Sequence, residues 1–156
     1  MRMDQWTVKA QEALAAAQSS AMEAGHAAVT PLHVLDALLK QDGGLAGPLL
    51  EKVGIPAQRI TSVVDSELGR LPSQSTGGGM SMDQALNGVI VRAAKEAKDL
   101  TDEYISVEHL LLALAEVPSD AKEVLSTLGA DRDGILEAMK ELRGNQRVTD
   151  ASPEDK

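Results

Sequence analysis

The side chains best suited to chemistry are three histidines and a group of carboxylates. His33 and His109 lie 76 residues apart, and each follows a hydroxyl residue, Thr30 or Ser106, by three positions. Two imidazoles could share a metal ion, but zinc usually takes three or four protein ligands and this chain has no cysteine to complete the set. Alternatively, each histidine forms a hydrogen bond near the start of a helix, and we favour that structural role. His26 stands in a polar stretch without an evident partner.

Three carboxylates, Asp102, Glu103 and Glu108, are the candidates for acid–base catalysis, because they cluster around one turn. Such catalysis needs carboxylates whose pKa values are shifted in a pocket. Carboxylates at a helix start also have a structural explanation, since they interact favourably with the positive end of the helix dipole. The chain shows no spacing typical of a Ser/His/Asp or Cys/His arrangement. We therefore expect no catalytic residue, and no enzyme, in this segment.

The glycine run Gly77-Gly78-Gly79 could suggest a nucleotide site. A phosphate loop needs the pattern Gly-x-x-x-x-Gly-Lys-Ser/Thr between a strand and a helix, with the lysine reaching the phosphates. No lysine follows this run directly and no strand pattern precedes it. The segment is therefore predicted to bind no cofactor and no metal.

The stretches that carry His33 and His109 are two copies of one pattern. Residues 30–39 and 106–115 each contain a hydroxyl residue, a histidine three positions on, and an apolar run with Ala-Leu. A hydroxyl at a helix N-cap accepts hydrogen bonds from the amides of the first turn, so each copy predicts a helix start. The correspondence continues upstream at the same offset and downstream at an offset one shorter: Leu14, Ala17, Ala21 and Val29 match Ile90, Ala93, Ala97 and Ile105, and Leu49, Leu50, Gly54 and Ile60 match Val124, Leu125, Gly129 and Ile135. Two units of about 65 to 70 residues, related by a pseudo-twofold axis, are predicted.

Composition predicts an all-α fold. The 156 residues suit one domain, and 43% of them are apolar, with no Phe, one Trp and one Tyr. Ala, Leu and Val must therefore fill the core, which suits closely packed helices, and strand signals are sparse. We predict two pseudo-twofold-related four-helix repeats, about eight helices in all, packed as one globular domain.

Four segments follow from this pattern. The first repeat is predicted over 1–68 and the second over 83–143. Residues 69–82 are rich in Gly and Ser and are predicted to form a flexible connector. Residues 144–156 are polar and without helical periodicity, so we interpret them as the start of a linker.

The charge and the terminal sequence exclude several classes of partner. A net charge of −9 and a pI near 4.7 argue against binding to nucleic acid, because a surface of that sign repels phosphate. No apolar run approaches the roughly 18 residues of a membrane span, and no signal peptide pattern opens the chain. The absence of cysteine fits a cytoplasmic protein.

Apolar residues outside the repeated core pattern indicate a binding surface. Leu112 stands where the first copy has Asp36, a position that we expect to be solvated. Each of the two long helices has an apolar stripe that we expect to face the core, with Leu14 in the first and Ile90 in the second. Val8 and Val91 lie off these stripes, Val91 by about 100°. We predict that Val8, Val91 and Leu112 line an exposed apolar groove between the two units. The alternative is that they fill the core between the units.

Several motifs, taken in order, match a known family. They are Met1-Arg2-x-Asp4-x-x-Thr7-x-Lys9 followed by Gln11-Glu12-Ala13-Leu14, both Thr/Ser-x-x-His helix starts, Pro48-Leu49-Leu50 with Gly54, and Arg143-Gly144-Asn145-Gln146-Arg147-Val148-Thr149. With these motifs the chain resembles the N-terminal domain of the Clp ATPases, specifically of the ClpB-type protein disaggregases. The resemblance covers nearly the whole chain.

This resemblance implies a role in a larger machine. Family members are hexameric AAA-plus proteins that hydrolyse ATP with Mg and thread aggregated polypeptides through a pore, together with the DnaK-type chaperone system. Their N-domain, two pseudo-repeats of four helices on a flexible tether, engages unfolded or aggregated substrate. The ATPase modules are missing from this sequence, so the segment alone is expected to be monomeric.

The resemblance also implies polar substrate contacts at Thr7, Asp102 and Glu108, beside an apolar groove. Each has a structural explanation too: Thr7 as a helix cap, and Asp102 and Glu108 as carboxylates at a helix start. Val107 precedes Glu108 where the family commonly has a polar residue or Pro, and Leu32 stands at the corresponding place in the first copy. The sequence leaves open which repeat presents the groove.

Two hypotheses follow. The leading one is a recognition domain that binds exposed hydrophobic segments of unfolded or aggregated proteins. The alternative is a stand-alone adaptor of Clp N repeats that docks a folded partner protein.

Overall fold

The computed structural model describes residues 3–73, 81–144 and 151. Within these residues the chain forms eight α-helices, one short 3-10 helix and two strands of two residues each, which confirms the predicted all-α class. The elements in order are the 3-10 helix Met3–Gln5, α1 (Val8–Glu23), β1 (Ala28–Val29), α2 (Pro31–Lys40), α3 (Ala46–Val53), α4 (Ala57–Gly69), β2 (Ser81–Met82), α5 (Gln84–Asp99), α6 (Val107–Glu116), α7 (Asp120–Leu128) and α8 (Arg132–Arg143).

Two reciprocal backbone pairings confirm the pseudo-twofold relation. Val29 pairs with Met82 between β1 and β2, and Trp6 pairs with Ile105 in a single bridge, both parallel. An offset of 76 residues converts one pairing into the other, because it relates Val29 to Ile105 and Trp6 to Met82. We call residues related in this way equivalent. The offset between equivalent residues is 76 up to the end of α2 and α6, and 75 in the helices that follow, α3 and α4 in the first repeat and α7 and α8 in the second.

The helix ends repeat as well. Thr30 and Ser106 begin α2 and α6 as capping boxes in which a histidine, His33 or His109, occupies the third helical position. A capping box satisfies two otherwise unpaired backbone donors at a helix start. Gly54 and Gly129 end α3 and α7 in the left-handed conformation, with φ of 113° and 101°. These ends let short loops redirect the chain after each of these two helices.

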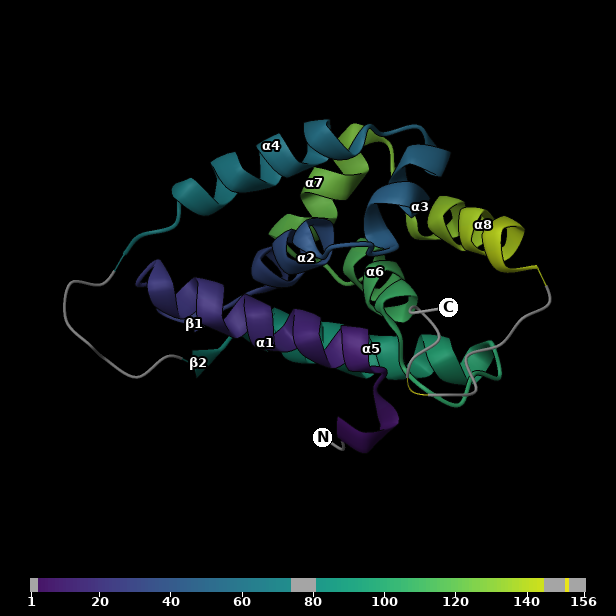
Figure 1. Ribbon diagram of the computed structural model, residues 1–156. Helices are drawn as coiled ribbons and strands as arrows, with labels where there is room; N and C mark the ends of the chain where they lie inside the picture. The colour runs from purple at the N-terminus through teal and green to yellow at the C-terminus, as the bar shows by residue number, and fades with distance from the viewer. Residues whose placement is uncertain (1–2, 74–80, 145–150, 152–156) are drawn as a thin grey trace.

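The helices pack in three layers (Figure 1). The central layer is formed by α2 and α6, whose residues are buried on nearly every side. On one side lie α1 and α5, which pack on α2 and α6 respectively. On the other side the third helix of each repeat packs on the fourth helix of the other repeat, α3 on α8 and α7 on α4. Neither repeat could bury its apolar faces alone, so the two form one core.

The core consists mainly of Ala, Leu and Val, as the composition predicted. The buried side of α1 is made of four alanines, Ala10, Ala13, Ala17 and Ala21, which allow close approach to α2. Leu14, which we expected on this buried face, is only partly buried and lies at its edge.

The two segments predicted as connector and linker are only partly described. In 69–82, Ser73 Oγ donates to the carbonyl of Ala24 at 3.0 Å, and Ser81–Met82 forms β2. Residues 74–80 of the predicted connector lie outside the described residues, as do 145–150 and 152–156 of the predicted linker. Ala151 accepts a backbone hydrogen bond from the amide of Val8 at 2.8 Å.

Candidate binding groove

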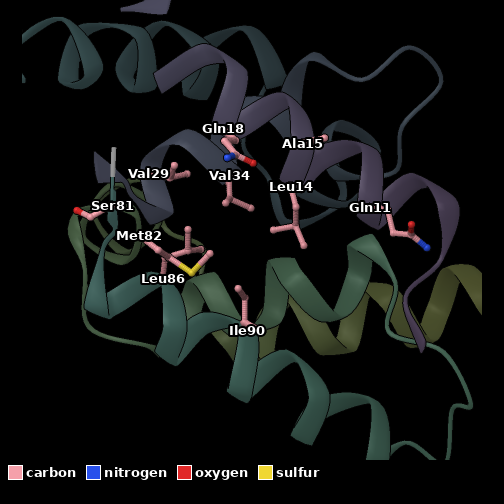
Figure 2. Close-up of a pocket in the computed structure, with 10 residues that line it drawn as sticks. All are labelled: Gln11, Leu14, Ala15, Gln18, Val29, Val34, Ser81, Met82, Leu86 and Ile90. Atoms are coloured by element: carbon pink, nitrogen blue, oxygen red, sulfur yellow. The ribbon is translucent and has the colours of Figure 1, made fainter. Parts of the chain in front are cut away.

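An apolar groove lies between α1 and α5, where the two repeats meet. It encloses about 320 Å³, and Figure 2 shows the side chains that line it. Its lining comes from both repeats: Gln11, Leu14, Ala15 and Gln18 of α1, Val29 of β1, Val34 of α2, Ser81 and Met82 of β2, and Leu86 and Ile90 of α5.

The floor of this α1/α5 groove is apolar and its rim is polar but uncharged. Val34 and Leu86 are buried at the bottom, and Leu14 and Ile90 point toward each other across the cavity (Figure 2). Gln11 and Gln18 are the amide side chains of the lining, and Gln11 Nε2 donates to the carbonyl of Trp6 at 2.9 Å. A surface of this kind can desolvate an apolar side chain and offer hydrogen bonds to a peptide backbone.

The groove lies beside Met82 and, within the described residues, has no counterpart beside the equivalent residue, Trp6, because the two side chains differ in size. Met82 lines the wall of the cavity and remains 46% exposed. Its equivalent Trp6 is 2% exposed and belongs to the core. Next to Ile105, the Trp6 indole therefore fills the space that is equivalent to the groove next to Val29.

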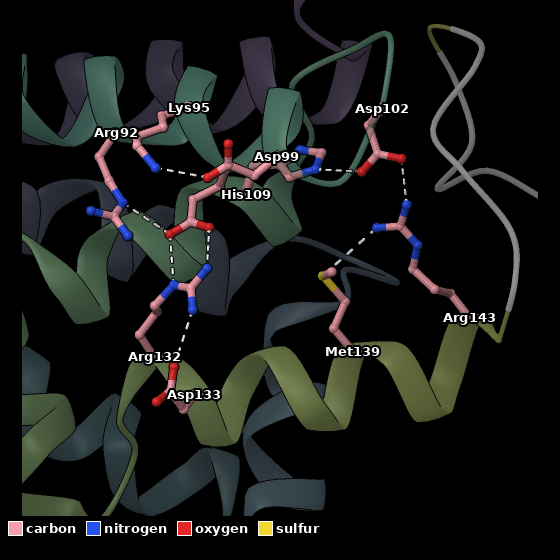
Figure 3. A network of polar contacts seen from close by, with 10 residues as sticks. Arg92, Lys95, Asp99, Asp102, His109, Arg132, Asp133, Met139 and Arg143 are labelled. Carbon is pink, nitrogen blue, oxygen red and sulfur yellow. Dashed lines mark hydrogen bonds and ion pairs between the residues drawn. The ribbon is translucent and has the colours of Figure 1, made fainter.

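The three polar residues predicted as substrate contacts are engaged in contacts within the domain. Thr7 is fully buried and caps α1, where its Oγ1 accepts from the amide of Ala10 at 3.2 Å. Asp102 is buried between His109, whose Nε2 lies 2.7 Å from Oδ2, and Arg143 of α8 (Figure 3). Glu108 lies 3.8 Å from the same arginine. These contacts hold the end of α8 against the turn before α6, and a contact of the three residues with substrate stays a prediction.

The structural role that we favoured for His33 and His109 is confirmed. The Nδ1 atom of each ring accepts from the backbone amide of its N-cap residue, at 3.0 Å in the first repeat and 2.8 Å in the second. The second ring nitrogen meets different partners: His33 Nε2 lies 2.8 Å from His26 Nδ1, while His109 Nε2 meets Asp102. The expectation that His26 lacks a partner was wrong. Burial, and next the nearby His26, lower the pKa of His33 to about 4.

Comparison with known proteins gives the family. A family model described as the Clp repeat N-terminal domain matches residues 5–128. The chain belongs to that family. This Clp N domain is 41% identical over 153 residues to the chaperone protein ClpB of Rhodopirellula baltica, a match that covers 98% of this chain but 17% of that relative.

Two solved structures show the same fold. The Hsp104 N-terminal domain from Candida albicans has a TM-score of 0.82 at 25% identity, covering 97% of this chain and 99% of that one. A ClpV N-domain in complex with a VipB peptide has a TM-score of 0.72 at 17% identity, covering 96% and 90%. The chain is thus a Clp N domain of the ClpB/Hsp104 type, as the sequence motifs implied.

Within this Clp N domain, the three apolar residues expected on a groove lie in different environments. Leu112 is fully buried in the central helix α6, so its expected position on an exposed groove was wrong, and the alternative that it fills the core is confirmed. Asp36 is only 5% exposed, so its expected solvation was wrong too. Val8 and Val91 are exposed, at 40% and 71%, but neither belongs to the lining of the α1/α5 groove.

Two of the residues that line the groove belong to the apolar stripes of the long helices, so the sequence predicted them as core residues. Leu14 and its equivalent Ile90 lie on the stripes that we expected to face the core. Periodicity separates a buried face from a solvated one, but it does not show that two such stripes face each other across a gap. Their equivalence did not single them out, because many other residues of the two repeats are equivalent as well.

A buried ion pair connects the groove wall α5 to α8. Arg132 donates from Nε and Nη2 to the two carboxylate oxygens of Glu96, at 2.8 Å and 2.6 Å, and Arg92 Nε adds a contact at 3.0 Å (Figure 3). Burial raises the pKa of Glu96, but the hydrogen bonds from both arginines outweigh it, so the pKa lies below the usual value. The ionised pair therefore holds α5 in place.

None of the helices described is both long enough and apolar enough to span a membrane.

Proposed function

We propose that this Clp N domain recognises exposed apolar segments of unfolded or aggregated polypeptides and seats their side chains in the α1/α5 groove. The observation that carries the proposal is an apolar cavity of about 320 Å³ with an uncharged rim, on a protein of net charge −9. Since the rim carries no charge, the groove selects for burial of apolar surface and reads little sequence.

The size of the groove fits a short stretch of chain. Ligand cavities usually enclose about 300–1,000 Å³, so this one accepts a few side chains and not the surface of a folded domain. Full burial of one large apolar side chain is worth about 1.5–3 kcal/mol, so one or two seated side chains give weak, micromolar or weaker binding. The complex of the ClpV N-domain with a VipB peptide supports a peptide as the occupant of this fold.

A role for the domain within a larger protein is suggested by the curated relatives. The chain spans about a sixth of their length. We propose that the domain delivers substrate to AAA-plus modules that hydrolyse ATP with Mg, within a cytoplasmic hexamer that cooperates with a DnaK-type chaperone. The groove is then a first, reversible contact, since weak binding allows transfer of the chain to the next module.

The test is a binding titration of the domain with a permanently unfolded model protein, followed by NMR amide shifts. Leu14→Ser and Ile90→Ser remove apolar surface from facing walls of the groove, and each should weaken binding several-fold while thermal unfolding stays cooperative. Val91→Ser, one position away on the exposed side of α5, is the matched control and should bind as the parent does. Equal loss in all three variants, or shifts confined to residues outside the groove, would contradict the proposal.

A further inference from the structure

The strand β2 is paired with β1 along one edge. The Ser81 amide donates to the carbonyl of Ala27 at 3.1 Å. Two residues on, the Asp83 amide donates to the carbonyl of Val29 at 2.9 Å. Successive residues of a strand direct their backbone groups to opposite sides, so the N–H and C=O of Met82 face away from β1. No described residue forms a hydrogen bond with either group, and both residues of β2 are exposed.

This unpaired edge continues into Gln84, the first residue of α5. The N–H groups of a first helical turn have no acceptor within their own helix. The side chain of the N-cap residue Asp83 accepts from none of them, and no other described residue accepts from the Gln84 amide. Met82 and Gln84 are two residues apart, which is the spacing at which a strand edge pairs with another extended chain. The edge thus offers two donors and one acceptor.

The equivalent edge already holds a piece of polypeptide backbone. The equivalent of Gln84 is Val8, the first residue of α1. Its amide donates to the carbonyl of Ala151 at 2.8 Å. Ala151 follows the last helix, so its carbonyl reaches the start of α1 from outside the two helical units. The molecule itself therefore indicates the ligand that suits this type of edge, which is a further stretch of polypeptide.

The carbonyl groups of the two edges differ in the same way. Gln11 Nε2 donates to the carbonyl of Trp6 at 2.9 Å, and the equivalents of these residues are Asn87 and Met82. The Asn87 side chain is shorter by one methylene group and is exposed, and no described residue donates to the Met82 carbonyl. The edge at Trp6 is thus occupied from within the domain, whereas the edge at Met82 is available.

We propose that an extended segment of an unfolded polypeptide pairs with this edge of β2, with one of its carbonyls accepting from the Gln84 amide and its backbone pairing with that of Met82. The edge adjoins the groove, because Ser81 and Met82 also line the α1/α5 groove (Figure 2). Alternate side chains of the same segment enter the groove while its backbone is held at the edge. This inference rests on the proposed function and adds the backbone contacts of the same ligand.

The pairing gives the domain a criterion for recognising unfolded chains. The backbone donors and acceptors of a folded protein are already paired with each other. An apolar side chain next to an unpaired, extended backbone occurs in unfolded or aggregated polypeptides. The edge and the groove together therefore favour such chains over a folded surface, and they do so without a fixed sequence.

The substitution Gln84→Pro tests the pairing, because it removes the amide donor. Proline is favoured at the first position of a helix, where Pro31 stands in α2. Asp83, with φ of −62° and ψ of 142°, already has the conformation required before proline, so the fold should be kept. Gln84→Ala loses the side chain but keeps the amide, and it is the matched control. Val8→Pro removes the equivalent amide at the other edge and should leave peptide binding unchanged.

The probe is the peptide acetyl-Gly-Ser-Leu-Ser-Leu-Ser-Gly-amide, titrated against the parent and the three variants. Gln84→Pro should bind it about three- to tenfold more weakly than Gln84→Ala does, the effect of one net hydrogen bond. Amide hydrogen exchange of the parent is a second measurement that needs no variant. Saturation with the peptide should slow the exchange of the Met82 and Gln84 amides by at least about tenfold.

The proposal is overturned if Gln84→Pro binds as Gln84→Ala does, or if the Met82 and Gln84 amides exchange as fast in the complex as in the free domain. Slow exchange of these amides in the free domain that becomes fast on dilution would identify a second copy of the chain as the occupant and would also overturn it. Weakened binding in Leu14→Ser and Ile90→Ser with unchanged binding in Gln84→Pro would reject the edge and keep the groove. Unchanged binding in all three would reject both.

Discussion

The two repeats of this Clp N domain share a backbone plan and differ in the side chains placed on it. Both begin their central helix with a histidine capping box, and both pair the segment before their long helix with the other repeat. The differences lie at equivalent positions: Trp6 and Met82, Ser20 and Glu96, His26 and Asp102, Ala57 and Arg132, Leu68 and Arg143.

These differences give the second repeat buried ion pairs that the first repeat lacks. Two arginines of α8, Arg132 and Arg143, reach buried carboxylates of the second repeat, and the equivalent residues of α4 cannot do so. The α1/α5 groove, in contrast, has walls from both repeats, α1 from the first and α5 from the second. The comparison indicates that the duplicated contacts stabilise the fold, while the unmatched side chains decide which surface is available for binding.

The largest expected effect comes from breaking the buried pair that the first repeat lacks. Arg132→Ala leaves Glu96 buried with Arg92 as its remaining partner and should lower the free energy of unfolding by about 3–4 kcal/mol. The double variant Glu96→Ser/Arg132→Ala copies the residues of the first repeat and should be more stable than Arg132→Ala alone. Urea denaturation of the three proteins measures both quantities. A double variant less stable than the single one would show that the pair contributes more than the removal of an unpaired charge.

The next effect concerns Trp6 and its equivalent Met82, which lines the groove. Trp6→Met should lower the free energy of unfolding by about 2–3 kcal/mol, because it removes buried apolar surface and leaves a cavity. Met82→Trp makes the reverse change at an exposed position, so its cost in stability should be small, but it should obstruct the α1/α5 groove. We expect Met82→Trp to weaken binding of an unfolded protein about tenfold, corresponding to roughly one lost side-chain contact. Unchanged binding in Met82→Trp would place the substrate elsewhere.

The histidine pair of the first repeat predicts an acid-sensitive stability. The pKa of His33 is lowered to about 4 in the folded state, against about 6.5 in the unfolded chain, so the unfolded chain binds more protons between these values. The stability that this group contributes is therefore complete above about pH 6.5 and is lost as the pH falls toward 4, by up to about 3 kcal/mol. His33→Gln keeps a polar partner for the cap and removes the titration.

The measurement is chemical denaturation of the parent and of His33→Gln at pH 7, 6, 5 and 4. The parent should lose more stability than the variant between pH 6.5 and 4, where His33 titrates only in the unfolded chain. If the two proteins lose the same amount, the titration of His33 makes no contribution to acid sensitivity.

The fold was predicted well from the sequence because the same helix-start pattern occurs in both repeats, so each copy supports the interpretation of the other. The hydroxyl–histidine spacing predicted both helix starts, whereas the reciprocal backbone pairings made by Val29 and Ile105 were not predicted. The groove was not predictable in the same way. Leu14 and Ile90 have the periodicity of core residues, and α2 and α6 are buried on nearly all sides, so the charge of Asp36 gave a false indication of exposure. Burial of this kind follows from tertiary packing and not from any pattern within one helix.

The smallest effect concerns the turn that follows each long helix, where the repeats again differ by one side chain. Gly25 and its equivalent Thr101 both adopt positive φ, 71° and 58°. A β-branched residue is strained there, at a cost of about 1–3 kcal/mol, whereas glycine adopts the conformation freely. Thr101→Gly removes the strain but adds conformational freedom to the unfolded chain, worth about 0.4–1 kcal/mol in the opposite direction. We expect a net gain of about 0.5–1 kcal/mol, visible as a higher urea midpoint with an unchanged slope. Gly25→Thr, the matched reverse change, should destabilise the domain. The Thr101 hydroxyl donates to the carbonyl of Leu100 at 2.6 Å, and a loss of stability in Thr101→Gly would mean that this hydrogen bond outweighs the backbone strain.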